Sequence, residues 1–126
     1  MNERMLVDHE LVDETAELMR LLSDPTRLRV LGLLQPGEMN VTALCGKLDL
    51  AQPTVSHHLG LLRSAGLVQT RREGKQIHYS LNPDLLEPFG THGGLRMSYG
   101  NVRMSLGCHA NGTEQVAHPS ALASPN

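Results

Sequence analysis

A polar helical face between residues 52 and 64 carries side chains suited to hydrogen bonding with a nucleic acid. At about 100° per residue, one side of such a helix is apolar, formed by Val55, Leu59 and Leu62. The other side has no carboxylate and presents Ser56, His57 and Arg63. Hydroxyl, imidazole and guanidinium groups are donors that suit base edges and phosphates. We therefore expect this face to contact DNA.

The residues around that face divide its two histidines and extend its contacts. His58 stands beside the apolar stripe, so we expect it to pack against the domain while His57 is presented to solvent. Gln52 and Thr54, at the start of the helix, are added to the predicted DNA contacts.

Two short helices are needed to position this face. The first spans residues 41–48, with apolar residues at i, i+3, i+4 and i+7: Val41, Leu44, Cys45 and Leu48. Asn40 is its expected N-cap and Asp49 its expected end. Gln52 is expected to cap the second helix, with Pro53 in the first helical position and Gly66 as the stop. Two helices joined by so tight a turn form a helix-turn-helix.

Charge is distributed unevenly along the 126 residues, although the net charge is only −2. Residues 1–24 have seven acids against two bases, giving −5. Residues 25–82 have seven bases against three acids, giving +4, and the remainder has three acids against two bases, giving −1. The positive charge is therefore concentrated around the helix pair, as a DNA-binding surface requires.

Length and composition predict one domain with an aliphatic core. A chain of 126 residues supports a single core, and only 2% of its residues are aromatic. We expect no membrane span, because no run of about 18 apolar residues occurs, and no signal peptide. Two cysteines are too few for a disulfide framework, so a cytoplasmic location is the default expectation.

The other elements complete a winged helix. Glu10 to Leu22 is expected to be helical, with an inward stripe formed by Leu11, Val12, Ala16, Met19 and Leu22. Asp24 is expected to cap the next helix, which begins at Pro25 and buries Leu28, Leu31 and Leu34. Residues 68–72 and 76–81 read as a hairpin with a basic tip, and its predicted phosphate contacts are Arg71, Arg72 and Lys75.

Three segments together resemble the ArsR/SmtB family of bacterial metal-responsive and related repressors. They are SDPTRLRVLGLL, AQPTVSHHLGLLRSAGLV and REGKQIHYSL, in order and at suitable separations over residues 18–81. The resemblance implies a homodimer that binds a palindromic operator on double-stranded DNA and leaves it when an inducer binds. It also implies a sequence-specific transcriptional regulator.

The inducer sites known in that family are incomplete here. One type places a Cys-x-Cys pair on the helix before the recognition helix, but Lys47 stands where the second cysteine would follow Cys45. Another type uses ligands on a long C-terminal helix, whereas residues 82–87 allow barely two turns before Pro88. Metal sensing therefore does not transfer from the resemblance, and the cofactor, if any, is a metal ion or a thiol modification acting as inducer.

A second hairpin is predicted where the family's long last helix would lie. Residues 95–106 alternate strictly on both sides of Gly100-Asn101, a dipeptide that suits a two-residue turn. The register pairs Tyr99 with Val102, Met97 with Met104 and Leu95 with Leu106 on one apolar face. We expect this face to pack on the first helix near Leu11, Val12 and Met19, with Gly90, Gly93 and Gly94 as a hinge, and to support the dimer.

The sequence thus predicts an α+β, mostly helical fold with three segments. Residues 1–89 form the winged helix-turn-helix domain with a two-stranded wing, residues 90–109 a glycine-rich segment with the added β-hairpin, and residues 110–126 a disordered tail. An enzyme is not expected, because no phosphate loop, catalytic Ser/His/Asp set or metal-hydrolase spacing occurs. Two alternatives remain open: a thiol- or metal-responsive repressor using Cys45, Cys108 and His109, and a winged-helix module that binds protein instead of DNA.

Overall fold

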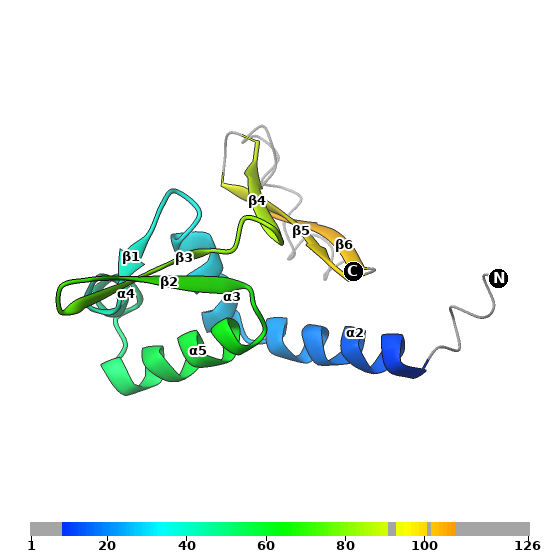
Figure 1. Cartoon of the computed structure of the whole chain (residues 1–126), viewed down its shortest axis with the longest axis horizontal. Coiled ribbons are helices and arrows are strands. Elements are labelled where there is room, and N and C mark those ends of the chain that lie inside the picture. The colour runs from blue at the N-terminus through cyan, green and yellow to red at the C-terminus, as the bar shows by residue number, and fades with distance from the viewer. Residues whose placement is uncertain (1–8, 91–92, 101, 108–126) are drawn as a thin grey trace, which may run out of the picture.

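The computed structural model describes residues 9–90, 93–100 and 102–107 and has the predicted winged helix-turn-helix architecture (Figure 1). Its helices are α2 (His9–Leu22), α3 (Pro25–Leu33), α4 (Val41–Leu48) and α5 (Gln52–Ser64). Its strands are β1 (Met39–Asn40), β2 (Val68–Glu73), β3 (Gln76–Leu81), β4 (Leu86–Phe89), β5 (Gly94–Tyr99) and β6 (Val102–Leu106). They form two antiparallel sheets, one in the order β1-β3-β2 and the other in the order β4-β5-β6.

Side-chain caps start two of the helices where the sequence predicts them. The Asp24 carboxylate accepts hydrogen bonds from the backbone N–H groups of Thr26 and Arg27, at 2.8 and 3.3 Å, and thereby caps α3. The Asn40 side chain accepts from Ala43 N at 2.8 Å and caps α4. Each bond satisfies a backbone donor that has no partner inside its own helix.

The start of α5 differs from the prediction by one residue. Gln52 is already helical, Pro53 follows it, and Ala51 is the N-cap without a side-chain hydrogen bond. The carbonyl of Ala51 accepts instead from Thr54 N and Val55 N, both at 3.1 Å. The Gln52 side chain is therefore not needed as a cap and remains exposed.

The turn between α4 and α5 depends on one left-handed residue. Asp49 has φ 58° and ψ 47°, and its N–H donates to the Cys45 carbonyl at 2.7 Å. Aspartate tolerates this conformation better than β-branched or bulky residues do. At the other end of α5, Gly66 has φ +82° and ends the helix, as predicted.

The core lies between α3, α4, α5 and the ends of both sheets. Its central side chains, all at 0% exposure, are Val30, Leu44, Val55, Leu59, Leu62, Leu67 and Met97. The apolar stripe predicted for α5 is thus its buried face, and Leu31 and Leu34 are buried as predicted. Leu28 is an exception at 39% exposure, because the inward side of α3 runs through Val30 and Leu31 instead.

The prediction for α2 is wrong in its inward stripe. Leu18 and Leu22 are buried, whereas Val12 is 49% exposed and Met19 is 40% exposed. The helix has two adjacent apolar faces, and only one of them meets the core. In Figure 1, α2 projects from the body of the domain, so its second apolar face is left in solvent.

The C-terminal hairpin has the predicted register. Tyr99 pairs with Val102, Met97 with Met104 and Leu95 with Leu106. The turn residue Gly100 has a φ of +59°, a conformation that both common two-residue hairpin turns require of their first central residue.

A third strand precedes that hairpin, contrary to the short helix predicted for residues 82–87. Leu86 is fully committed to the sheet, facing Met97 across β4 and β5, and Phe89 faces Gly94. The predicted boundary after residue 89 therefore falls between two paired strands. Glycine is required at the close approach of the strand ends, because a Cβ on Gly107 would lie 2.4 Å from the Cα of Gly94.

The C-terminal sheet packs on the body of the domain and does not cover the apolar face of α2, contrary to the prediction. Leu86, Leu95 and Met97 join the main core. The Tyr99 hydroxyl donates to the Ala65 carbonyl at 3.1 Å, and Ser98 N donates to the Leu85 carbonyl at 2.8 Å. Gly90 and Gly93 flank the β4–β5 connection instead of forming a long hinge. The predicted tail, residues 110–126, lies outside the described residues.

Candidate nucleic-acid interface

The polar face of α5 is presented to solvent as predicted. Gln52, Thr54, Ser56, His57 and Arg63 are all exposed, while Val55, Leu59 and Leu62 hold the opposite face in the core. No hydrogen bond or ion pair within the described residues engages these five side chains. They are therefore free to form hydrogen bonds with another molecule without first breaking any here.

His58 is half-buried, as predicted, and is held by a residue that the sequence pattern did not single out. Arg27, on α3, donates from Nε to His58 Nδ1 at 3.2 Å and from Nη1 to the Leu21 carbonyl at 3.0 Å. The His58 ring lies 5.7 Å from the ring of His57. Arg27 thus joins the α2–α3 corner to the middle of α5 and helps to fix the orientation of its exposed face.

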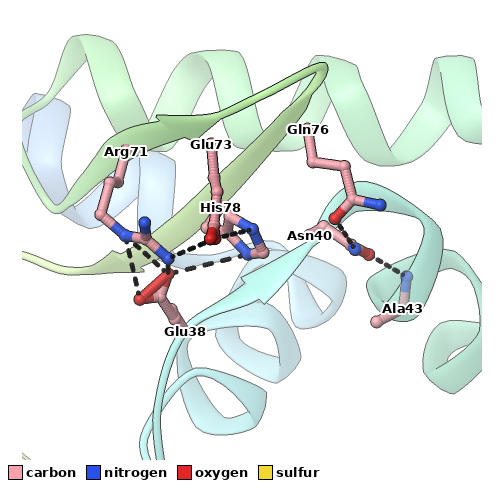
Figure 2. A network of polar contacts seen from close by, with 7 residues as sticks. All are labelled: Glu38, Asn40, Ala43, Arg71, Glu73, Gln76 and His78. Carbon is pink, nitrogen blue, oxygen red and sulfur yellow. Dashed lines mark hydrogen bonds and ion pairs between the residues drawn. The ribbon is translucent and has the colours of Figure 1, made fainter.

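The wing contains a cluster of charged side chains that gathers around Arg71 (Figure 2). The Arg71 guanidinium lies 2.8 Å from Glu38 and 3.2 Å from Glu73. His78, directly opposite Arg71 in the β2–β3 register, lies 3.7 Å from Glu38 and 3.5 Å from Glu73. Arg71 was predicted to contact phosphate, but in this structure two carboxylates already occupy its guanidinium.

The ionisation of Glu38 and Arg71 reflects their contact. The hydrogen bond from Arg71, and its positive charge, hold the pKa of Glu38 below its ordinary value of 4.5. The same hydrogen bond from the other side, together with the negative charges of Glu38 and Glu73, raises the pKa of Arg71 further above 12.5. Both groups are therefore charged at neutral pH, and the pair carries no net charge toward DNA.

The two other basic residues of the wing are placed differently from Arg71. Arg72 pairs with Ile77, so its side chain leaves the opposite face of the sheet, and its Nη1 lies 3.4 Å from the Gly74 carbonyl. Lys75 is in the two-residue turn with Gly74 and is exposed. No hydrogen bond or ion pair in the described part of the chain engages its ammonium group. Lys75 is therefore the unneutralised cation at the tip of the wing.

A short third strand ties the wing to the helix-turn-helix. Strand β1, which the sequence did not predict, pairs Asn40 with His78 and Met39 with Tyr79. Asn40 caps α4 through its oxygen and donates through Nδ2 to Gln76 at 3.1 Å (Figure 2). One side chain thus positions both α4 and the wing.

The candidate metal and thiol residues are only partly placed. Cys45 is a free, half-buried thiol on α4 that packs against the core. Cys108 and His109 lie outside the described residues. Within the described residues, no group of three or more His, Cys, Asp or Glu side chains is arranged to hold a metal ion. Likewise, no described helix is long and apolar enough to cross a membrane.

Two residues of this interface, Arg27 and Glu38, were missed by the sequence analysis. Arg27 is 31 positions from His58, and Glu38 is 33 positions from Arg71. For Glu38 a weak signal existed, since it is one of only three acids in the basic segment 25–82. For Arg27 no signal was available, because its partner is known only once α3 and α5 are packed together.

Comparison with known proteins places this geometry in a family. The model of the bacterial regulatory protein arsR family matches residues 24–70, which contain α3, α4, α5 and the start of β2. The biofilm growth-associated repressor of Agrobacterium fabrum is 51% identical over 71 residues, and the arsenical resistance operon repressor of Escherichia coli is 46% identical over 70 residues. These matches cover 56% and 55% of this chain, but only 61% and 60% of those relatives.

Other matches extend over more of the compared protein. The transcriptional repressor SdpR of Bacillus subtilis is 36% identical over 56% of this chain and 78% of its own length. The structure of the transcriptional repressor BigR from Xylella fastidiosa has a TM-score of 0.54 and 41% identity, over 64% of this chain and 80% of that one. A homodimeric winged helix-turn-helix DNA-binding domain from Mycobacterium bovis has a TM-score of 0.57 and 33% identity, over 62% and 72%. Such coverage, with the match over residues 24–70, shows that the chain belongs to the arsR family of bacterial regulatory proteins.

Proposed function

We propose that this protein is a cytoplasmic, sequence-specific transcriptional repressor that binds a palindromic operator as a homodimer and is released by an inducer. The observation that carries the proposal is the exposed face of α5, which has donors, no carboxylate and no internal partners. Relatives that share the fold are named repressors, and the family is one of regulators, not enzymes, as the sequence predicted.

In this proposal α5 lies in the major groove and the wing contacts the backbone. Ser56 and His57 read base edges, Arg63 reaches base or phosphate, and Lys75 neutralises a phosphate. Gln52 and Thr54, in the first turn of α5, are the other contacts. The wing cations supply the salt-dependent part of the affinity.

Dimer formation is proposed to use the second apolar face of α2. Val12 and Met19 are seven positions apart, so they lie on one side of the helix, and both are exposed. The matched domain from Mycobacterium bovis is homodimeric, which supports a dimer here. A symmetric dimer presents two α5 helices, and each subunit then reads one half of a palindrome.

Dimerisation can be tested at that face. Val12→Lys with Met19→Lys should convert a dimer to monomers in sedimentation experiments at micromolar concentration, because lysine charges cannot be buried unpaired. Leu28→Lys is the matched control, since Leu28 is also an exposed apolar residue but lies on α3. A dimer that survives the α2 double substitution would place the interface elsewhere.

DNA binding can be tested by selecting bound sequences from a random duplex library and measuring their affinity at several salt concentrations. A palindromic consensus is expected, with affinity that falls steeply as salt rises, because neutralised phosphates release counterions. Recovery of no consensus and no salt dependence would favour the alternative, a module that binds protein. Repeating the selection with divalent metals and with thiol oxidants tests whether Cys45, Cys108 and His109 make the repressor metal- or thiol-responsive.

A further inference from the structure

A hollow of about 640 Å³ lies between α2, the end of α5 and strand β5. This volume is in the range of pockets that hold small organic molecules. Residues from α2, α3, α5 and β5 line it, so it joins the projecting helix, the recognition helix and the C-terminal sheet. None of the DNA contacts predicted above except the neighbouring Arg63 lies close to it in sequence, and no contact predicted for DNA lines it.

The floor of the hollow is apolar and has one aromatic wall. Leu18 and Leu21 contribute from α2, and Leu61 and Ala65 from the end of α5. The ring of Tyr99 is held in place by its hydroxyl, which donates to the Ala65 carbonyl at 3.1 Å. A flat or branched apolar group could therefore displace water from this floor at little cost in ordering the protein.

The α2 side of the hollow carries two carboxylates above that floor. Glu14, Glu17, Leu18 and Leu21 stand at i, i+3, i+4 and i+7, so they share one face of the helix. Both glutamates are exposed, and no hydrogen bond or ion pair in the described residues engages them. Arg20 also lines the hollow and is the nearest opposing charge in the sequence of α2.

We propose that this hollow binds a small organic cation with an apolar or aromatic body. The ammonium group lies beside Glu14 and Glu17, and the body lies on the leucine floor against the Tyr99 ring. Aromatic rings and carboxylates both attract organic ammonium groups, and here they occur on facing walls of one hollow. The dimer face proposed for Val12 and Met19 lies on another side of α2, so both can be used at once.

Occupancy of the hollow is coupled to DNA through Arg27, a step that rests on the proposed function. Arg27 lines the hollow, and it also joins Leu21, which lines it too, to His58 on the recognition helix. A ligand body that reaches the Leu21 end displaces the Arg27 side chain and weakens its bond to His58. The exposed face of α5 is then less firmly oriented, and operator affinity falls.

Calorimetric titration of the full chain with benzyltrimethylammonium tests the site without DNA. Saturable binding is expected, and Glu14→Gln with Glu17→Gln should weaken it about tenfold, the sum of two modest ion pairs. Asp13→Asn, which removes a charge from α2 outside the hollow, should have little effect. Arg20→Gln should tighten binding, because it removes the opposing charge.

Two results would overturn the cation site. One is no saturable binding of the probe, including the case in which the glutamate substitutions instead change the dimer, which would make the hollow a contact between subunits. The other is equal binding of neopentylbenzene, the neutral isostere, which would make the hollow merely apolar.

Release from DNA tests the coupling separately. The probe should lower the affinity for the selected operator in the wild-type protein, and much less in the Glu14→Gln, Glu17→Gln variant. Probe binding with unchanged operator affinity would overturn the coupling and leave the repressor assignment intact. Failure to bind any operator would instead refute the proposed function, while the calorimetric result for the hollow would still stand.

Discussion

The recognition helix α5 and the wing both present basic side chains to solvent, but they differ in how those side chains are engaged. On α5, the side chains of Ser56, His57 and Arg63 form no hydrogen bond or ion pair within the described residues. On the wing, Arg71 is held by Glu38 and Glu73. Contact by α5 therefore needs no exchange of partners, whereas Arg71 must leave a carboxylate before it can bind a phosphate.

This difference teaches that counting basic residues overstates the contribution of the wing. Exposed ion pairs are worth about 0–1 kcal/mol, so replacing Glu38 by a phosphate gains little net free energy. Lys75 has no such competitor among the described residues and should contribute a full phosphate contact. We therefore expect α5 to determine specificity, Lys75 to add affinity for any DNA, and Arg71 to be restrained by Glu38.

The largest expected effect is on α5. Ser56→Ala with His57→Ala should abolish the preference for the operator, at a cost of about 1–3 kcal/mol for each lost base contact. The free energy of unfolding should hardly change, because both side chains point away from the core. Competition binding of operator against random duplex, beside chemical denaturation, measures both quantities.

Ser105→Ala, an exposed serine on β6, is the control for that double substitution and should leave DNA binding unchanged. Full operator preference in the double variant would mean that the reading face of α5 is misassigned.

A smaller and non-specific effect is expected at the tip of the wing. Lys75→Ala should weaken operator and random DNA alike, and the slope of log K against log salt should become shallower by about 0.9. Arg103→Ala removes an equally exposed cation from β6 and should not alter the slope. If only operator binding suffers, the wing reads bases and the contrast with α5 disappears.

An increase in affinity is expected when the restraint on Arg71 is removed. Glu38→Gln should tighten binding of operator and random DNA a few-fold, because it frees a guanidinium and removes a repelling carboxylate, each within the range of about 0–1 kcal/mol for exposed pairs. The matched control is Glu87→Gln, which breaks the exposed Glu87–Arg96 pair (3.4 Å) and changes the net charge equally. Weaker DNA binding in Glu38→Gln would show that Glu38 positions Arg71 for DNA instead of competing with it.

The smallest effect concerns acid pH. Because Arg71 lowers the pKa of Glu38, Glu38 contributes stability above its ordinary value of 4.5, and that contribution is lost as pH falls through the lowered pKa. The Tm difference between wild type and Glu38→Gln should therefore shrink below pH 4.5. Paired thermal melts at several pH values measure it, and a difference that grows on acidification would contradict this account.

Much of the local structure could be predicted from sequence because its causes are local. Asp24 and Asn40 are confirmed as N-caps, since a cap needs only a short polar side chain before a helix. The C-terminal hairpin has the predicted pairing of Met97 with Met104, because strict alternation around a two-residue turn permits one register. The buried and exposed faces of α5 also follow from spacing alone.

The sequence by itself therefore determined the helix-turn-helix, the two hairpins and the exposed donors of α5, all within about twenty residues of chain each. Tertiary structure alone decided which apolar face of α2 is buried, and it left Val12 and Met19 in solvent. It also decided that Arg27 meets His58 and that Glu38 holds Arg71, across 31 and 33 positions. Periodicity shows that a side chain lies on a face, but only packing shows what that face meets, because a contact between distant residues depends on how their elements are arranged in space.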